Sequence, residues 1–137
     1  MDEPKLREVR QWIAKAGRDL RSAKRLFSDT PPLLDTAAYH CQQAAEKALK
    51  AFLAMHDIPF QKTHLLAPLV LQCMQPDPGF RSLQEAAEIL TPFATAFRYP
   101  GEPGEPEATD VEEAIELAQR VVDFVSKRLP AEARSPG

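Results

Sequence analysis

Apolar side chains recur every three or four residues through most of this chain, which is the spacing of helices that bury one face. The pattern predicts a first helix over about 4–27 and a second helix that ends near Met55. Either Asp35 or Thr36 is a suitable N-cap for the second helix, because both side chains can accept a hydrogen bond from the first turn. A shorter third helix is expected over 65–74.

Prolines divide the rest of the chain into short segments. A fourth helix is predicted over 83–90, and Pro92 is expected to kink or end it because proline removes a backbone donor. The repeated Gly-Glu-Pro of residues 101–108 is typical of an irregular, mobile loop. A final helix is then expected from Thr109 or Asp110 to Pro130.

No segment shows the alternating pattern of a strand, and the connections between the predicted helices are short. These features predict an all-α fold, an antiparallel up-down four-helix bundle with a short additional helix. The chain is long enough for one domain, which we expect over 1–130, followed by a disordered tail over 131–137.

Charge is unevenly distributed along the chain, although the formal net charge is only −3. Residues 1–64 carry 11 Lys and Arg against 8 Asp and Glu, whereas residues 65–137 carry 6 against 12. The first half could therefore face a phosphate group or an acidic partner. Its positive excess is far below that of a dedicated DNA-binding protein, and solvated helix faces would give the same pattern.

The chain starts without an apolar leader, and its longest apolar run, 65–71, is too short to span a bilayer. Neither a signal peptide nor a membrane partner is expected. Cys41 and Cys73 lie on apolar faces, so we interpret them as reduced core thiols of a cytoplasmic protein, with a disulfide or redox pair as the alternative.

Several common catalytic and cofactor motifs are absent from the sequence. It has no glycine-rich phosphate loop, CxxC, HExxH or GxSxG. His40, His56 and His64 are too scattered to predict a metal site, and no cofactor is expected.

Two segments carry candidate chemistry. In the first, FRYPG at 97–101, the guanidinium of Arg98 could bind a phosphate and the ring of Tyr99 could stack on a base. The alternative is that Arg98 bridges helix ends and Tyr99 packs beside Pro100. In the second, AAYHCQQAAEKALKAFL at 37–53, a polar line could face the same cleft, or form a solvated face or a dimer interface; it consists of His40, Gln43, Lys47 and Lys50.

Four segments in this order resemble a HEPN domain, the higher eukaryotes and prokaryotes nucleotide-binding domain. They are WIAKAGRDLRSAKRLF at 12–27, AAYHCQQAAEKALKAFL at 37–53, KTHLL at 62–66 and FRYPG at 97–101, and the match runs from Trp12 to Leu129. The resemblance implies a bundle of four to five helices and a homodimer. It also implies a minimal nucleotidyltransferase as a partner, in a pair that can act as a toxin–antitoxin system.

Active proteins of this family are metal-independent RNases that use an arginine followed four to six residues later by a histidine at the dimer cleft. Arg98 lies at the arginine position, but the sequence YPGEPGEP follows it without a histidine. None of the three histidines has an arginine four to six residues before it. Without a histidine no general acid or base is in place for RNA cleavage, whereas phosphate binding needs no proton transfer.

The sequence therefore predicts a module that binds nucleotide or RNA phosphate, or partners a nucleotidyltransferase, without catalysis. The predicted ligand-binding residues are Arg98, Tyr99, Gln43, Lys47, Lys50, His40 and His64. The alternative is a metal-independent RNase toxin in which Arg98 works with His40 or His64 from elsewhere in the dimer. Proximity of either histidine to Arg98 would favour this alternative.

Overall fold

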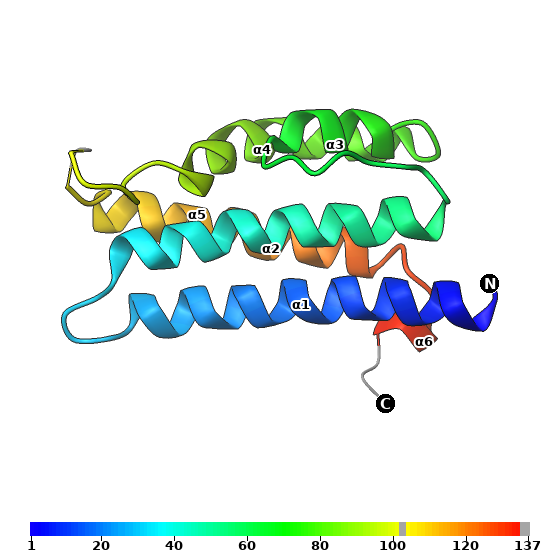
Figure 1. Cartoon of the computed structure of the whole chain (residues 1–137), viewed down its shortest axis with the longest axis horizontal. Coiled ribbons are helices and arrows are strands. Elements are labelled where there is room, and N and C mark those ends of the chain that lie inside the picture. The colour runs from blue at the N-terminus through cyan, green and yellow to red at the C-terminus, as the bar shows by residue number, and fades with distance from the viewer. Residues whose placement is uncertain (102–103, 135–137) are drawn as a thin grey trace.

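The computed structural model describes residues 1–101 and 104–134, and it places them in a layered bundle of helices (Figure 1). The elements in chain order are α1 (Glu3–Phe27), α2 (Leu34–Met55), α3 (Leu66–Cys73), the 3-10 helix η1 (Pro78–Leu83), α4 (Gln84–Leu90), the 3-10 helix η2 (Thr91–Ala94), α5 (Ala108–Ser126) and α6 (Ala131–Arg134). The described residues contain no strand, so the prediction of an all-α bundle is confirmed.

The helix α2 lies at the centre of the bundle, between α1 on one side and the α3–α4 pair on the other (Figure 1). It also packs against α5 and η2. Its alanines are buried against these neighbours, and such small side chains let helix backbones approach closely. Because α2 is covered on several sides, even its polar residues Gln42, Gln43, Glu46 and Lys50 are buried.

The segment between α2 and α3 runs back along α2, so that α3 and α4 form a short hairpin over it (Figure 1). Two side-chain hydrogen bonds hold this segment in place. Gln72 Nε2 donates to the carbonyl of Pro59 at 2.8 Å, and Gln42 Nε2 donates to the carbonyl of His64 at 2.8 Å. This hairpin completes the bundle formed by the longer helices α1, α2 and α5.

Both predicted N-caps are wrong. The helix α2 begins at Leu34 after Leu33, and α5 begins at Ala108 after Glu107, in each case without a side-chain cap. Leu34 packs against a small apolar cluster that includes Val111, so tertiary packing rather than a polar cap sets the start of α2.

The expectation of a disordered tail is corrected for residues 131–134, which form α6. Ala133 is buried in the core, and the guanidinium of Arg10 donates from Nε at 3.0 Å and Nη2 at 2.8 Å to the carbonyl of Glu132. The domain therefore extends at least to Arg134. Residues 135–137 lie outside the described residues.

The loop expected over 101–108 is irregular where it is described, up to Glu107. Pro106 is buried, so the loop is anchored just before α5 rather than detached throughout. Residues 102 and 103 of this loop lie outside the described residues.

Both cysteines are free and buried, as their apolar positions predicted. Burial raises the pKa of the Cys41 thiol to about 12, and burial followed by the charge of Asp77 does the same for Cys73. Both thiols are therefore protonated at neutral pH. Over the described residues, no helix combines the length and apolar character that crossing a bilayer requires.

Candidate functional site

Side chains from two distant parts of the sequence meet near the N-terminal end of α2. The guanidinium carbon of Arg98 lies 4.0 Å from the ring centroid of Tyr39, within the range of a cation–π contact. The Tyr39 ring in turn meets the His40 ring edge-on, with centroids 5.5 Å apart. Together with Asp35 and Thr36, these three side chains line a hollow of about 270 Å³, which we call the Arg98 hollow.

The backbone before Arg98 turns this residue back over α2. Phe97 has a φ of 68°, in the left-handed region that L-residues with large side chains rarely adopt. This conformation costs about 1–2 kcal/mol, which the surrounding structure must offset. Arg98 Nη1 also donates to the carbonyl of Ala94 at 3.0 Å, so the guanidinium is held at two points while the residue stays exposed.

His40 is oriented by a buried carboxylate from α1. Its Nδ1 lies 2.8 Å from Asp19 Oδ1, and Lys47 Nζ donates to Asp19 Oδ2 at 2.7 Å. Because a carboxylate only accepts hydrogen bonds, Nδ1 carries a proton, and in the neutral form of the imidazole Nε2 is then the acceptor. Asp19 thus fixes both the ring orientation and the tautomer of His40.

His40 lies between two hollows. Besides the Arg98 hollow it lines a second one of about 440 Å³, together with Arg21, Arg25 and Thr36. The edge of the imidazole is therefore near arginines of α1 on one side and Arg98 on the other. Such a setting suits an anionic ligand, because guanidinium groups pair with phosphate oxygens through two parallel hydrogen bonds.

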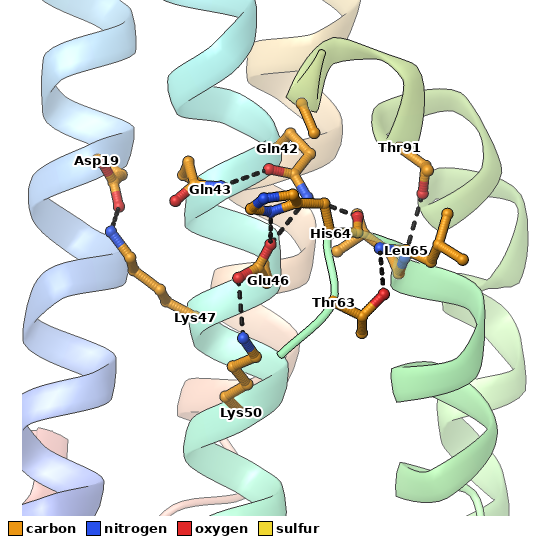
Figure 2. A network of polar contacts seen from close by, with 12 residues as sticks. Asp19, Gln42, Gln43, Glu46, Lys47, Lys50, Thr63, His64, Leu65 and Thr91 are labelled. Carbon is orange, nitrogen blue, oxygen red and sulfur yellow. Dashed lines mark hydrogen bonds and ion pairs between the residues drawn. The ribbon is translucent and has the colours of Figure 1, made fainter. Parts of the chain in front are cut away.

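A second polar network surrounds Glu46 at the middle of α2 (Figure 2). Lys50 Nζ donates to Glu46 Oε2 at 2.9 Å, Gln42 Nε2 donates to Oε1 at 3.1 Å, and His64 Nδ1 lies 3.1 Å from Oε1. Gln43 Nε2 extends the network by donating to Gln42 Oε1 at 2.7 Å. These bonds tie the segment before α3 to α2.

Glu46 and Lys50 are each only 6% exposed, so each charge needs the other nearby to offset the cost of its removal from water. Burial alone would raise the pKa of Glu46, but the hydrogen bonds from Lys50, Gln42 and His64 outweigh burial and lower the pKa below its usual range. The ammonium of Lys50 also lies 5.6 Å from the Trp12 ring and 5.5 Å from the Phe60 ring. This network is built to hold the bundle together.

The structure divides the residues that the sequence singled out. Arg98 and His40 line one hollow, and Lys47 joins them through Asp19. Three further members of the set belong to the Glu46 network, namely Gln43, Lys50 and His64. Tyr99 is 61% exposed beside Arg98.

Sequence reasoning missed two contributors to the Arg98 hollow and its support. Tyr39 was not among the predicted ligand-binding residues, but its ring lies against the guanidinium of Arg98. Asp19 is buried beside Leu20 on α1, and a buried acid in a helix is a signal of a paired charge, although it does not reveal the partner. Among the described residues, no group of three His, Cys, Asp or Glu is arranged to hold a metal ion.

Comparison with protein families gives a match to the HEPN domain over residues 9–129. The chain belongs to the HEPN domain family. HEPN domains are helical modules of nucleotide-binding and RNase type, which agrees with the resemblance of the four sequence segments. Among curated proteins, no sequence matches this chain.

Two solved structures are similar to this HEPN domain. One is TT1696 from Thermus thermophilus, with a TM-score of 0.75 and 28% identity over 88% of this chain and 98% of that one. The other is ST0689, an archaeal HEPN homologue, with a TM-score of 0.69 and 28% identity over 88% of this chain and 96% of that one. The helical arrangement is thus shared along nearly the whole length of both.

Replacing Glu46 with Gln tests the network around it. The lowered pKa of Glu46 means that its charge stabilises the folded state above its ordinary pKa and that this contribution is lost as pH falls through the folded pKa. We expect Glu46→Gln to lose about 2–4 kcal/mol of unfolding free energy at pH 7, because Lys50 stays buried without its carboxylate. The difference from wild type should shrink on acidification, as measured by urea unfolding between pH 7 and pH 3.

Glu88→Gln is the matched control, because Glu88 is exposed on α4. It should change stability by less than about 0.5 kcal/mol at every pH. Equal changes in the free energy of unfolding for the two substitutions would show that the Glu46 network stabilises the bundle no more than an exposed glutamate does.

Proposed function

We propose that this HEPN domain is a homodimeric module that binds nucleotide or RNA phosphate in the Arg98 hollow, without needing catalysis. The observation that carries the proposal is the guanidinium of Arg98, exposed and held over the ring of Tyr39 beside His40. A guanidinium held in this way is already oriented for a phosphate and loses little freedom on binding.

The surroundings of Arg98 support recognition of a nucleotide rather than a bare anion. Tyr99 follows Arg98 directly, and its exposed ring is suited to stack on an unpaired base. The Arg98 hollow of about 270 Å³ is open to polar groups from Asp35, Thr36 and His40. Hydroxyl and carboxylate groups at this position suit the hydroxyls of a ribose.

The partner part of the proposal rests on the family and on exposed apolar side chains. We place the protein in the cytoplasm as a homodimer that pairs with a minimal nucleotidyltransferase in a toxin–antitoxin-like system. Leu65 lies directly before α3 and Leu71 lies within it, and each side chain is 56% exposed. Their exposure supports an apolar contact surface at α3.

The proposed homodimer can be tested by measuring the mass of the protein in solution. Light scattering should give about twice the 15.3 kDa mass of one chain across micromolar concentrations. Leu71→Glu should shift the mass towards that of one chain, because it places a charge on the proposed contact surface. A monomer mass for the unchanged protein would remove the homodimer from the proposal.

Phosphate binding is tested at Arg98. Arg98→Ala should weaken the affinity for a short RNA by roughly 10-fold or more, since it removes a charge-assisted pair worth about 1.5–3 kcal/mol. Stability should fall by less than about 1 kcal/mol, because the residue is exposed and its cation–π contact is modest. Fluorescence anisotropy and thermal unfolding give the two values.

Arg98→Lys is the control that keeps the positive charge. Its affinity for the short RNA should lie between those of the wild type and Arg98→Ala, because lysine cannot form two parallel hydrogen bonds with a phosphate. A large loss of stability with unchanged affinity would support the packing interpretation, in which Arg98 only bridges helix ends.

A second candidate function, a metal-independent RNase, is favoured by one specific observation. His40 and Arg98 line the same hollow within one subunit, although His40 does not follow Arg98 in sequence. Asp19 leaves Nε2 of His40 able to accept the proton of a ribose 2′-hydroxyl. The 2′-oxygen would then bond to phosphorus as the bond from phosphorus to the 5′-oxygen breaks, which leaves a 2′,3′-cyclic phosphate. The 5′-oxygen would take the proton that His40 had accepted and leave as a hydroxyl, with Arg98 stabilising the extra negative charge.

RNA cleavage in EDTA distinguishes the two functions. If the RNase operates, wild type should cleave, whereas Arg98→Ala and His40→Asn should each lose at least about 100-fold in rate. Asparagine keeps an amide donor for Asp19 but removes the base, so His40→Asn should stay folded. No cleavage by wild type would exclude the RNase and leave the binding module.

A further inference from the structure

Arginines form an exposed stripe along α1. Arg18, Arg21 and Arg25 are exposed, and with Arg10 they fall within about 80° of arc at 100° per residue, on one side of the helix. From Arg10 to Arg25 the stripe extends about 22 Å along the helix axis. No ion pair in the described part of the chain involves Arg18, Arg21 or Arg25, so their charges face solvent.

The stripe borders a groove between α1, α5 and α6 with a volume of about 520 Å³. Arg18, Arg21 and Arg134 line this groove, and its α1 wall includes Gly17 and Ala14, which have little or no side chain. Arg10 holds α6 against α1 through the carbonyl of Glu132, and α6 brings Arg134 to the groove. The C-terminal helix therefore places one more guanidinium beside those of α1.

This groove continues to the Arg98 hollow through shared residues. Arg21 lines both the groove and the neighbouring hollow of about 440 Å³, which also contains Arg25 and His40. His40 and Thr36 then line both that hollow and the Arg98 hollow. We call this continuous surface from Arg134 to Arg98 the arginine track.

The charge of the arginine track differs from that of the whole chain. Among the described residues, no Asp or Glu lines the groove or the hollow of about 440 Å³, and Asp35 is the one acidic residue that lines the Arg98 hollow, although the chain has a net charge of −3. A local row of guanidinium groups on an acidic protein indicates a surface for a polyanion.

We propose that the arginine track binds the backbone of a single-stranded RNA and that one nucleotide of this strand occupies the Arg98 hollow. This inference rests on the proposed function and names its ligand as an extended strand rather than a free nucleotide. The guanidinium row matches a run of phosphates. A single strand is required because a base can stack on an exposed tyrosine only when it is unpaired.

Gly17 provides the sharpest test, because a Cβ built there meets no atom within 4 Å. Gly17→Glu and Gly17→Gln have the same shape and both raise helix propensity, so both should fold. Only Gly17→Glu places a negative charge among Arg18, Arg21 and Arg134. Fluorescence anisotropy would compare a labelled RNA of about 12 nucleotides with a labelled ribodinucleotide.

We expect Gly17→Glu to bind the longer RNA roughly 10-fold more weakly than Gly17→Gln, with a shallower dependence on salt concentration. Binding of the ribodinucleotide should be the same in both variants, because it reaches only the Arg98 hollow. Arg98→Ala should weaken both ligands.

Equal affinity of Gly17→Glu and Gly17→Gln for the longer RNA would overturn the arginine track, and the proposed function would stand if Arg98→Ala still weakened both ligands. Failure of the wild type to bind either RNA would overturn both. A labelled poly-glutamate peptide that binds more tightly than the longer RNA would overturn the track as an RNA surface and assign it to an acidic protein.

Discussion

The near-complete burial of α2 is the constraint on which the rest of the structure depends. A helix covered on several sides cannot leave polar groups without partners, because each would cost on the order of 1–3 kcal/mol. The buried Glu46 therefore accepts hydrogen bonds from Lys50, Gln42 and His64, and Gln42 also holds the carbonyl of His64. These bonds fix the path of the chain between α2 and α3, and with it the place of the α3–α4 hairpin.

The same constraint prepares the candidate site. Asp19 is buried where α1 meets α2, so its charge must be satisfied, and His40 and Lys47 satisfy it. The bond that stabilises Asp19 also sets the orientation of His40. One buried carboxylate thus contributes both to the packing of the two long helices and to the chemistry of the surface beside them.

The two kinds of polar residue in this HEPN domain have separate roles. The Glu46–Lys50 pair is buried within the bundle, whereas Arg98 and the arginines Arg18, Arg21 and Arg25 of α1 lie on the surface. Exposed arginines add little stability, because solvent screens their charge. Their alignment with the hollows beside His40 is instead what a ligand with several phosphates would use, and this is why we propose a strand of RNA as the partner of that surface.

The sequence by itself determined the helices, because apolar periodicity is a local property, and it determined the HEPN resemblance, because four segments lie in the expected order. It also identified Arg98 and His40 as candidates. Only the tertiary structure decided that these two residues line the same hollow and that the guanidinium of Arg98 lies against the ring of Tyr39. It also decided that Asp19, which lies 21 residues before His40 in the sequence, orients the His40 ring. It likewise placed Lys50 and His64 in the Glu46 network and formed α6 where a disordered tail was expected. The reason is physical: contacts between residues far apart in sequence depend on how the helices pack, and periodicity along one helix does not contain that information.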